Sequence, residues 1–296
     1  RVQQAMARHG VGACYYGHCS VGVLHIRPIL NLKDPKDIAI LRALEEEMSD
    51  MVLEYGGAMS AEHGDGLARS EWIPKMFGAH IANLFEDVKG VFDPQGTMNP
   101  GKIVNAPRMD ENLRYGEQYE TRSLDTFFSF DEEGGFQEAV ELCSGVGQCR
   151  KKLVGTMCPS YMATLDEEHS TRGRANALRA ALSGTMNGGL LSEKVHEVMD
   201  LCLECKACKA ECPSNVDMAK LKYEYLAHYH REHGYPLRSY LFGYIGSFAR
   251  LGSALAPVSN WIAGSGLSRW FLDRFLGIDR RRALPRFVAQ PFSKWF

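Results

Sequence analysis

The sequence lacks a surplus of either charge. Its 296 residues include 34 lysines and arginines against 36 aspartates and glutamates. Nucleic acids and anionic membranes usually bind strongly basic surfaces, so we expect no nucleic-acid partner. Long apolar runs are also missing, because none reaches the roughly 18 residues that a membrane-spanning helix needs. With 45% hydrophobic and 24% charged residues, the chain reads as soluble protein with enough apolar content for two domains.

A secretory signal is absent too. The first ten residues, RVQQAMARHG, contain no apolar core of the kind that a signal peptide has. Residue 1 is Arg rather than Met, so we interpret the chain as an internal piece of a longer protein. We expect it in the cytoplasm, either free or peripheral on the inner face of the membrane.

The apolar pattern of residues 1–107 predicts an α+β domain. Residues 11–30 alternate small, apolar and aromatic side chains, which is typical of two short strands joined by a turn. From Asp37 to Tyr55 the apolar residues recur every three or four positions, as in an amphipathic helix that covers a sheet. A second helix is expected from about Pro74 to Val91.

The remainder of the chain favours helices. Residues 108–135 are polar and have no clear period, so we predict a linker there. Residues 136–235 are predicted to form an all-α ferredoxin-like domain, and residues 236–296 a packed helical tail. The expected helices of the all-α domain cover about residues 171–182, 192–201 and 219–230.

The nine cysteines are unevenly placed. Cys14 and Cys19 stand near the N-terminus, and the other seven fall between residues 143 and 212. Such clustering indicates ligation in a reducing compartment rather than a disulfide framework. Because Cys14 and Cys19 are isolated, we expect both to be buried core residues.

One cysteine motif is regular. The spacing C-x2-C-x2-C-x3-C-P begins at Cys202 and ends at Pro213. This is the pattern of bacterial ferredoxins, in which three thiolates hold one cluster and the fourth ligates a second. Zinc is the alternative, but zinc sites favour paired C-x2-C units about 15–20 residues apart. We therefore predict a 4Fe-4S cluster at Cys202, Cys205 and Cys208, with Cys212 directed to a neighbouring cluster.

The other motif is incomplete. It contains Cys143, Cys149 and Cys158, but Val146 stands where the full pattern has a cysteine. In the crossed arrangement Cys158 completes the first cluster, and a second site keeps only Cys143, Cys149 and Cys212. That site would hold a three-iron cluster, a four-iron cluster with a non-cysteine ligand, or no cluster. In the last case Cys143 and Cys149 are small buried thiols. The sequence thus predicts one or two clusters.

Two segments of the first domain concentrate imidazoles and carboxylates, namely YGHCSVGVLHIRP and AEHGDG. His18 and His25 flank the predicted turn, and Glu62 could add a carboxylate from a loop. Two histidines and one carboxylate with an open position are a common catalytic metal set, although a histidine pair seven apart is more often structural. His63 is a candidate base. The candidate anchors for a substrate carboxylate are Arg27 and Arg69.

The order of these motifs resembles that of a known protein family. GHxxxGxLH, then EHGDG, then FDPxGxxNPGKI resembles the C-terminal (cap/substrate) part of FAD-linked oxidases of the D-lactate, glycolate and D-2-hydroxyglutarate dehydrogenase group, over about residues 10–105. The cysteine region, with EEHSTRGRAN between its motifs, resembles the iron–sulfur half of large bacterial fusion proteins in which such an oxidase precedes a ferredoxin-like domain.

The resemblance implies specific roles. His18, His25 and Glu62 match the family's metal-binding positions, for zinc or manganese, and His63 matches its catalytic base. The resemblance also implies FAD, with a flavin-proximal segment at Asn99, Gly101 and Lys102 and the main FAD-binding domain outside this chain. Many members have Gly-Asp-Gly-Asn where this chain has SVGV at 20–23, and Asn where it has Arg27. The resemblance therefore leaves the choice of substrate open.

The expected function is oxidation of a D-2-hydroxy acid of the D-lactate or D-2-hydroxyglutarate type. Electrons would leave through the clusters to a quinone or a protein acceptor. One alternative is a non-catalytic electron-transfer module that docks a separate flavoprotein, but docking has no need of Glu62 and His63 beside a histidine pair. Another is a zinc-stabilised scaffold, which would be colourless. The sequence does not decide whether the chain forms a homo-oligomer.

Overall fold

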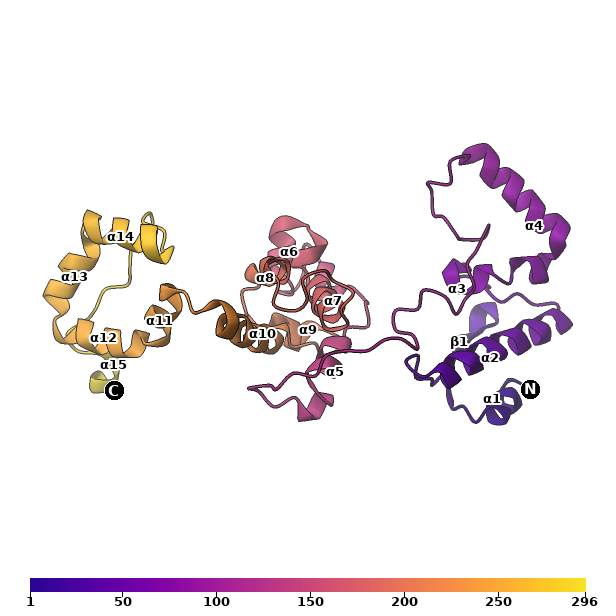
Figure 1. Cartoon of the computed structure of the whole chain (residues 1–296), viewed down its shortest axis with the longest axis horizontal. Helices are drawn as coiled ribbons and strands as arrows, with labels where there is room; N and C mark the ends of the chain where they lie inside the picture. Colours follow the sequence, from indigo (N-terminus) through magenta and orange to yellow (C-terminus); the bar gives the residue numbers. More distant parts are fainter. The chain divides into compact units, whose positions relative to one another are not determined.

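The computed structural model describes residues 1–292 and 294–296 and divides into two compact units, residues 1–120 and 121–296 (Figure 1). The first unit combines helices with a two-stranded sheet. In the described residues of the second unit, every regular element is a helix. The prediction of an α+β part followed by a helical part is confirmed.

A β-hairpin supplies the sheet of the first unit. Strand β1 (Ala13–His18) pairs antiparallel with β2 (Val23–Pro28). A short 3-10 turn over Cys19–Val21 joins them and ends at Gly22, whose φ of 67° is left-handed. Glycine adopts that conformation without the steric cost that a Cβ brings. The two strands predicted within residues 11–30 are confirmed.

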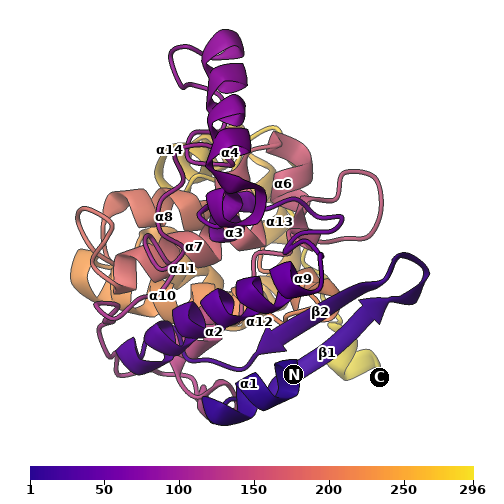
Figure 2. The ribbon, with the colours of Figure 1, turned by 90° about the vertical axis from the view of Figure 1, so that its right-hand side faces the viewer.

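Helix α2 (Pro35–Glu54) lies along the hairpin, and the short α1 (Val2–Arg8) packs beside α2 (Figure 2). The side chain of Asp34 caps α2 by accepting a hydrogen bond from the N–H of Lys36. Apolar side chains of α2 and residues of β2 line an open cavity of about 450 Å³. The amphipathic helix predicted over 37–55 is confirmed.

Helix α4 (Ile73–Phe92) follows the short α3 (Gly66–Ser70). Its extent agrees with the predicted helix over 74–91, but the helix is broken at Gly78, where φ is 80° and ψ is 158°. The apolar pattern continues across this position, so the periodicity gave no sign of the break. Glycine permits it because it has no Cβ.

Asp93 organises the turn after α4. Its buried carboxylate accepts hydrogen bonds from the main-chain N–H groups of Thr97 at 2.9 Å and Met98 at 2.8 Å. The ammonium of Lys89 lies 2.5 Å from the same carboxylate. These bonds, led by the one from Lys89, hold the pKa of Asp93 well below its usual range. The aspartate of the DPQGTMNPGK segment thus has a structural role.

We expect Asp93→Asn to loosen this turn. An amide cannot accept from both N–H groups and pair with Lys89, so the main-chain amides of Thr97 and Met98 should exchange about tenfold faster or more. Native-state hydrogen exchange measures this directly. The control is Asp87→Asn, which changes an exposed carboxylate on the same helix and should leave both rates as they are. Equal rates in the wild type and Asp93→Asn would contradict the assignment.

The second unit has its core around residues 130–225. Fully buried side chains from three helices meet there, including Leu178, Val195 and Tyr225. The helices over about 171–182, 192–201 and 219–230 are confirmed as α7, α8 and α10. The helices of this core are α5 (Phe136–Glu141), α6 (Pro159–Thr164), α7 (Thr171–Leu182), α8 (Glu193–Asp200), α9 (Ala207–Glu211) and α10 (Met218–His233).

The segment before this core is anchored to α10. Glu224 is completely buried, and its carboxylate accepts the N–H groups of Phe127 and Phe128, each at 3.0 Å. His228 lies 3.1 Å from the same carboxylate. The end of the polar stretch 108–135 is therefore held in place by a buried acid.

The C-terminal tail is helical, but little of it is packed. In α14 the side chains of Leu267, Trp270 and Phe271 are 78%, 48% and 51% exposed. These short helices follow one another in an arc (Figure 1). Much of their apolar surface is therefore uncovered within the described chain, and the expectation of a packed tail is wrong. None of the helices in that described part has the length and apolar content needed to cross a bilayer. The tail contains α11 (Leu237–Gly243), α12 (Ile245–Ala254), α13 (Ala256–Gly264), α14 (Gly266–Leu276) and α15 (Phe292–Trp295).

Candidate metal and cluster sites

Four polar side chains converge beside the hairpin. His18, His25, Glu62 and His63 each offer one ligand atom, and these atoms all lie within 4.8 Å of one another. We call these residues the tetrad. His18 pairs with Val23 in the hairpin register, so His18 and His25 are diagonal neighbours on one face of the sheet. Their Nε2 atoms are 3.3 Å apart.

The loop residues complete the tetrad. Oε1 of Glu62 is 2.6 Å from Nδ1 of His18 and 3.4 Å from Nε2 of His63. The rings of His25 and His63 stack with centroids 5.0 Å apart. Desolvation lowers the pKa of His25, and the nearby imidazoles of His18 and His63 lower it further. A neutral imidazole is the form that ligates a metal, so three nitrogens and one carboxylate fit zinc or manganese.

A cavity adjoins the tetrad. It measures about 450 Å³, and its lining includes His25, Glu62, His63, Arg27 and Arg69. One terminal nitrogen of Arg69 donates to the carbonyl of Gly64 at 2.7 Å. Its Nε is buried and has no hydrogen-bond partner within the described chain. An unused buried donor in the wall of a cavity suits an anionic ligand.

The cavity contains a carboxylate that the sequence reasoning missed. Glu45 of α2 lines it, and burial raises the pKa of this side chain while the charge of Arg69 opposes the rise. Position 45 lies on the apolar face of α2, next to Leu44 and one turn from Leu41. A charged residue on an apolar stripe was the signal that could have revealed it.

The predicted flavin-proximal residues lie elsewhere. Asn99, Gly101 and Lys102 belong to the turn after α4 and are absent from the lining of the cavity beside the tetrad. Nζ of Lys102 is 3.3 Å from the side-chain oxygen of Asn99. Gly101 has φ of 71°, and a Cβ there would lie 3.1 Å from Pro107, so the position requires glycine. Their role toward FAD stays a prediction.

Four cysteines of the second unit border one pocket. Cys158 stands just before α6, Cys202 and Cys205 lie in the coil after α8, and Cys208 is in α9. The coil bends through left-handed conformations at Glu204 and Lys206, with φ of 55° and 59°. We call the pocket bordered by these cysteines the four-cysteine pocket.

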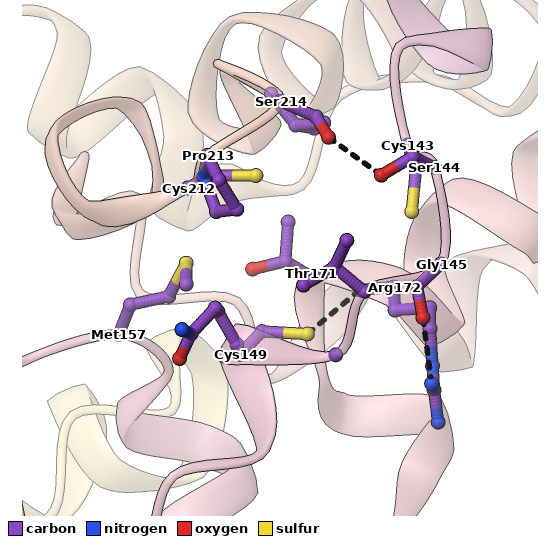
Figure 3. Close-up of a pocket in the computed structure, with 14 residues that line it drawn as sticks. Cys143, Ser144, Gly145, Cys149, Met157, Thr171, Arg172, Cys212, Pro213 and Ser214 are labelled. Atoms are coloured by element: carbon purple, nitrogen blue, oxygen red, sulfur yellow. Dashed lines mark hydrogen bonds between the residues drawn. The ribbon is translucent and has the colours of Figure 1, made fainter. Parts of the chain in front are cut away.

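Three further cysteines border a second pocket. Figure 3 shows the thiols of Cys143, Cys149 and Cys212 around a common space, which Thr171 and Met157 also border. Cys212 follows α9, so the helix separates it from the four-cysteine pocket. The hydroxyls of Ser144 and Ser214 are 2.7 Å apart and join the two cysteine segments. We call this the three-cysteine pocket.

The spacing of the thiols distinguishes clusters from single ions. Four sulfurs bound to one zinc at 2.3 Å lie about 3.8 Å from one another. Among the described residues, the tetrad is a group of side chains close enough to hold a single metal ion, and the cysteines of the two pockets do not form such a group. The cysteine pockets therefore do not have the arrangement of a single-ion zinc site, and their thiols suit a multinuclear cluster.

Cys14 and Cys19 are not core residues. Both are exposed, which corrects the expectation that isolated cysteines are buried. The cause is the hairpin: five of the six residues of β1 are exposed, because a two-stranded ribbon has little sheet area to cover.

Comparisons with known proteins agree with this geometry. Residues 1–103 match the family of FAD linked oxidases, C-terminal domain, and residues 142–217 match the 4Fe-4S dicluster domain. The chain joins an FAD linked oxidase C-terminal domain to a 4Fe-4S dicluster domain. The predicted resemblance is confirmed, and so are the predicted FAD and 4Fe-4S cofactors at the level of these domains.

Several relatives are dehydrogenases. A D-2-hydroxyglutarate dehydrogenase of Pseudomonas putida is 33% identical over 271 residues, which cover 79% of this chain and 26% of the relative. The Escherichia coli K12 protein of that name is 28% identical over 306 residues, covering 91% and 30%. The glycolate oxidase subunit GlcD of E. coli K12 is 28% identical over 102 residues, covering 34% and 20%.

The chain thus spans less than a third of the length of the curated relatives that it matches. No solved structure matches it. The oxidase domain contains the tetrad, and the dicluster domain contains both cysteine pockets, so each group of candidate ligands falls within one matched domain.

Proposed function

We propose that the two domains take part in the oxidation of a D-2-hydroxy acid, with D-2-hydroxyglutarate as the favoured substrate. The observation that carries this proposal is the tetrad at the wall of a cavity that also holds Arg27 and Arg69. Metal ligands beside two guanidinium groups suit a substrate with a hydroxyl and carboxylates. The printed names of the relatives support the same substrate class.

The side chains around the cavity have different proposed roles. His18, His25 and Glu62 would hold the divalent ion, and Arg27 and Arg69 would bind substrate carboxylates. A bound divalent ion supplies Lewis acidity toward the hydroxyl, and bound FAD supplies a hydride acceptor.

The proton needs an acceptor of its own. His63 is the proposed acceptor for the hydroxyl proton, at the ring nitrogen that lies 3.4 Å from Glu62.

The dicluster domain would carry the electrons onward. We assign one cluster to Cys158, Cys202, Cys205 and Cys208 and a second to Cys143, Cys149 and Cys212. Clusters held by these cysteines would supply one-electron transfer toward a quinone or protein acceptor. All nine cysteines are free, which suits the reducing cytoplasm, and a quinone acceptor would place the protein at the inner face of the membrane.

A substrate panel tests this proposal on the anaerobically purified holoenzyme. We expect turnover with D-2-hydroxyglutarate to exceed that with D-lactate and glycolate, because only the first offers a second carboxylate to the arginine pair. Replacing Arg27 with Leu should raise KM for D-2-hydroxyglutarate by about tenfold or more. KM for D-lactate should change less if Arg27 binds the distal carboxylate.

The panel also distinguishes the alternative. Absence of turnover with every hydroxy acid, together with cluster reduction by an added flavoprotein, would favour a docking module instead. A colourless protein without iron and sulfide would contradict both functions.

A further inference from the structure

Arg174 is a completely buried arginine at the wall of the four-cysteine pocket. It lies on α7, in the segment EEHSTRGRAN between the two cysteine motifs. Its guanidinium donates to the carbonyls of Val198 at 3.0 Å and His169 at 2.6 Å. It also donates to the hydroxyl of Ser160 at 3.0 Å, and one terminal nitrogen is 3.6 Å from the sulfur of Cys158.

This buried charge has no carboxylate partner among the residues that the structure describes. Within the described part of the chain, the ion pairs do not include Arg174, and its oxygen partners are neutral carbonyls and a hydroxyl. An arginine remains charged in proteins, and burying an unpaired charge is costly. A neighbour that can become an anion is the thiol of Cys158, and Cys202 borders the same pocket.

The polar contacts of Cys158 join it to this arginine. Its sulfur is 3.3 Å from the hydroxyl of Ser160, and that hydroxyl accepts a hydrogen bond from the guanidinium of Arg174 at 3.0 Å. Arg174, Ser160 and Cys158 all line the four-cysteine pocket, so the buried charge lies directly beside a proposed cluster ligand.

Two other cations near the pockets have carboxylate partners, and Lys206, which also lines the four-cysteine pocket, is exposed to solvent. Lys222 lies close to the backbone of Cys202 but is paired with Glu204 at 3.1 Å. At the three-cysteine pocket, Arg172 is paired with Glu167 at 2.6 Å. Only its main-chain N–H reaches a thiol there, at 3.4 Å from the sulfur of Cys149. The two pockets therefore differ in their fixed charge.

We propose that Arg174 is the counter-charge of the cluster in the four-cysteine pocket and raises the reduction potential of that cluster. Thiolate ligands give the site its negative charge, and a one-electron reduction adds another. A fixed positive charge in a water-poor interior stabilises the reduced state more than the oxidised state. Arg174 is thus a positioning residue that also sets a potential. This inference rests on the dicluster domain and not on the identity of the hydroxy acid.

Redox titration of the holoenzyme followed by EPR tests the proposal. In Arg174→Gln, reduction of this cluster should become at least about tenfold less favourable, which is about 59 mV for one electron. Arg174→Lys keeps the charge and should recover most of the difference. The matched control is Arg172→Gln, which removes a cation already neutralised beside the other pocket and should leave the potential of this cluster unchanged.

The proposal can also be tested if a variant loses the cluster. Loss of iron and sulfide from this pocket in Arg174→Gln but not in Arg174→Lys supports the counter-charge, because lysine lacks the guanidinium fork but retains the positive charge that glutamine lacks. Equal potentials in the wild type and Arg174→Gln overturn the proposal. Equal loss of the cluster in both variants, with a changed circular dichroism spectrum, overturns it as well, since the arginine would then act through packing.

Discussion

Replacing His63 with Gln is expected to reduce turnover of the D-2-hydroxy acid by about 10²–10⁴-fold while the divalent metal and both clusters remain bound. That range is the usual contribution of a positioned acid–base group. Glutamine keeps a hydrogen-bonding side chain but cannot take up the hydroxyl proton. Steady-state turnover of the holoenzyme, combined with metal, iron and flavin content per chain, measures both parts of the prediction.

The comparison with His25→Gln separates two roles that the geometry allows. His63 belongs to the tetrad, whose ligand atoms lie within 4.8 Å of one another, so it could complete the metal site as a fourth ligand. His25→Gln removes a proposed ligand and should lower the metal content together with turnover. If His63→Gln loses as much metal as His25→Gln, His63 is a ligand and not the base. Undiminished turnover in His63→Gln would remove this residue from the mechanism.

The tetrad could be anticipated because local structure brings its members together. Antiparallel pairing places His18 and His25 on one face whatever surrounds the hairpin, and the EHGDG loop adds Glu62 and His63. Glu45 was not predicted, because a helical pattern of apolar residues still predicts the same helix when one position of its apolar face is charged. The proximity of Glu45 to Arg69 depends on how α2 and the loop pack together, and local sequence patterns do not predict such tertiary packing.

The cysteine region shows the same limit. Motif spacing alone predicted that Cys212 and Cys158 would change places between the two groups, and the pockets have this arrangement. Arg172 and Arg174 look alike in the sequence. Two residues apart on a helix, they point in different directions, so one reaches an exposed acid and the other is buried. Only the packing of α7 against the cysteine loops decides which arginine faces which pocket.

Burial was the property that sequence patterns predicted least well. The tail over residues 236–296 was expected to be packed, yet its side chains of Leu267, Trp270 and Phe271 are about half exposed or more. Amphipathic spacing reports that a helix has an apolar face, but it does not say what covers that face. Cys14 and Cys19 fail for the same reason, since a ribbon of two strands exposes both of its faces.

Serine substitutions at Cys208 and Cys212 are expected to damage two different clusters, although the residues are neighbours in one motif. Cys208 borders the four-cysteine pocket and Cys212 the three-cysteine pocket. A serine hydroxyl is a much poorer iron ligand than a thiolate, so each variant should lose the signal and most of the iron of its own cluster. EPR of the reduced holoenzyme, with iron and sulfide analysis, measures the losses. Loss of the same cluster in both variants would contradict the crossed arrangement.

Val146→Cys extends the test to the missing ligand. Val146 borders the three-cysteine pocket and is 66% exposed, so a thiol there can reach the cluster if the glycine-flanked loop moves inward. A three-iron cluster is paramagnetic when oxidised, whereas a four-iron cluster in its ordinary oxidised state is not. If the pocket holds three irons, Val146→Cys should abolish the oxidised signal and raise the iron content from about seven to about eight per chain. An unchanged iron content of about eight would instead show that a non-cysteine ligand already completes a four-iron cluster.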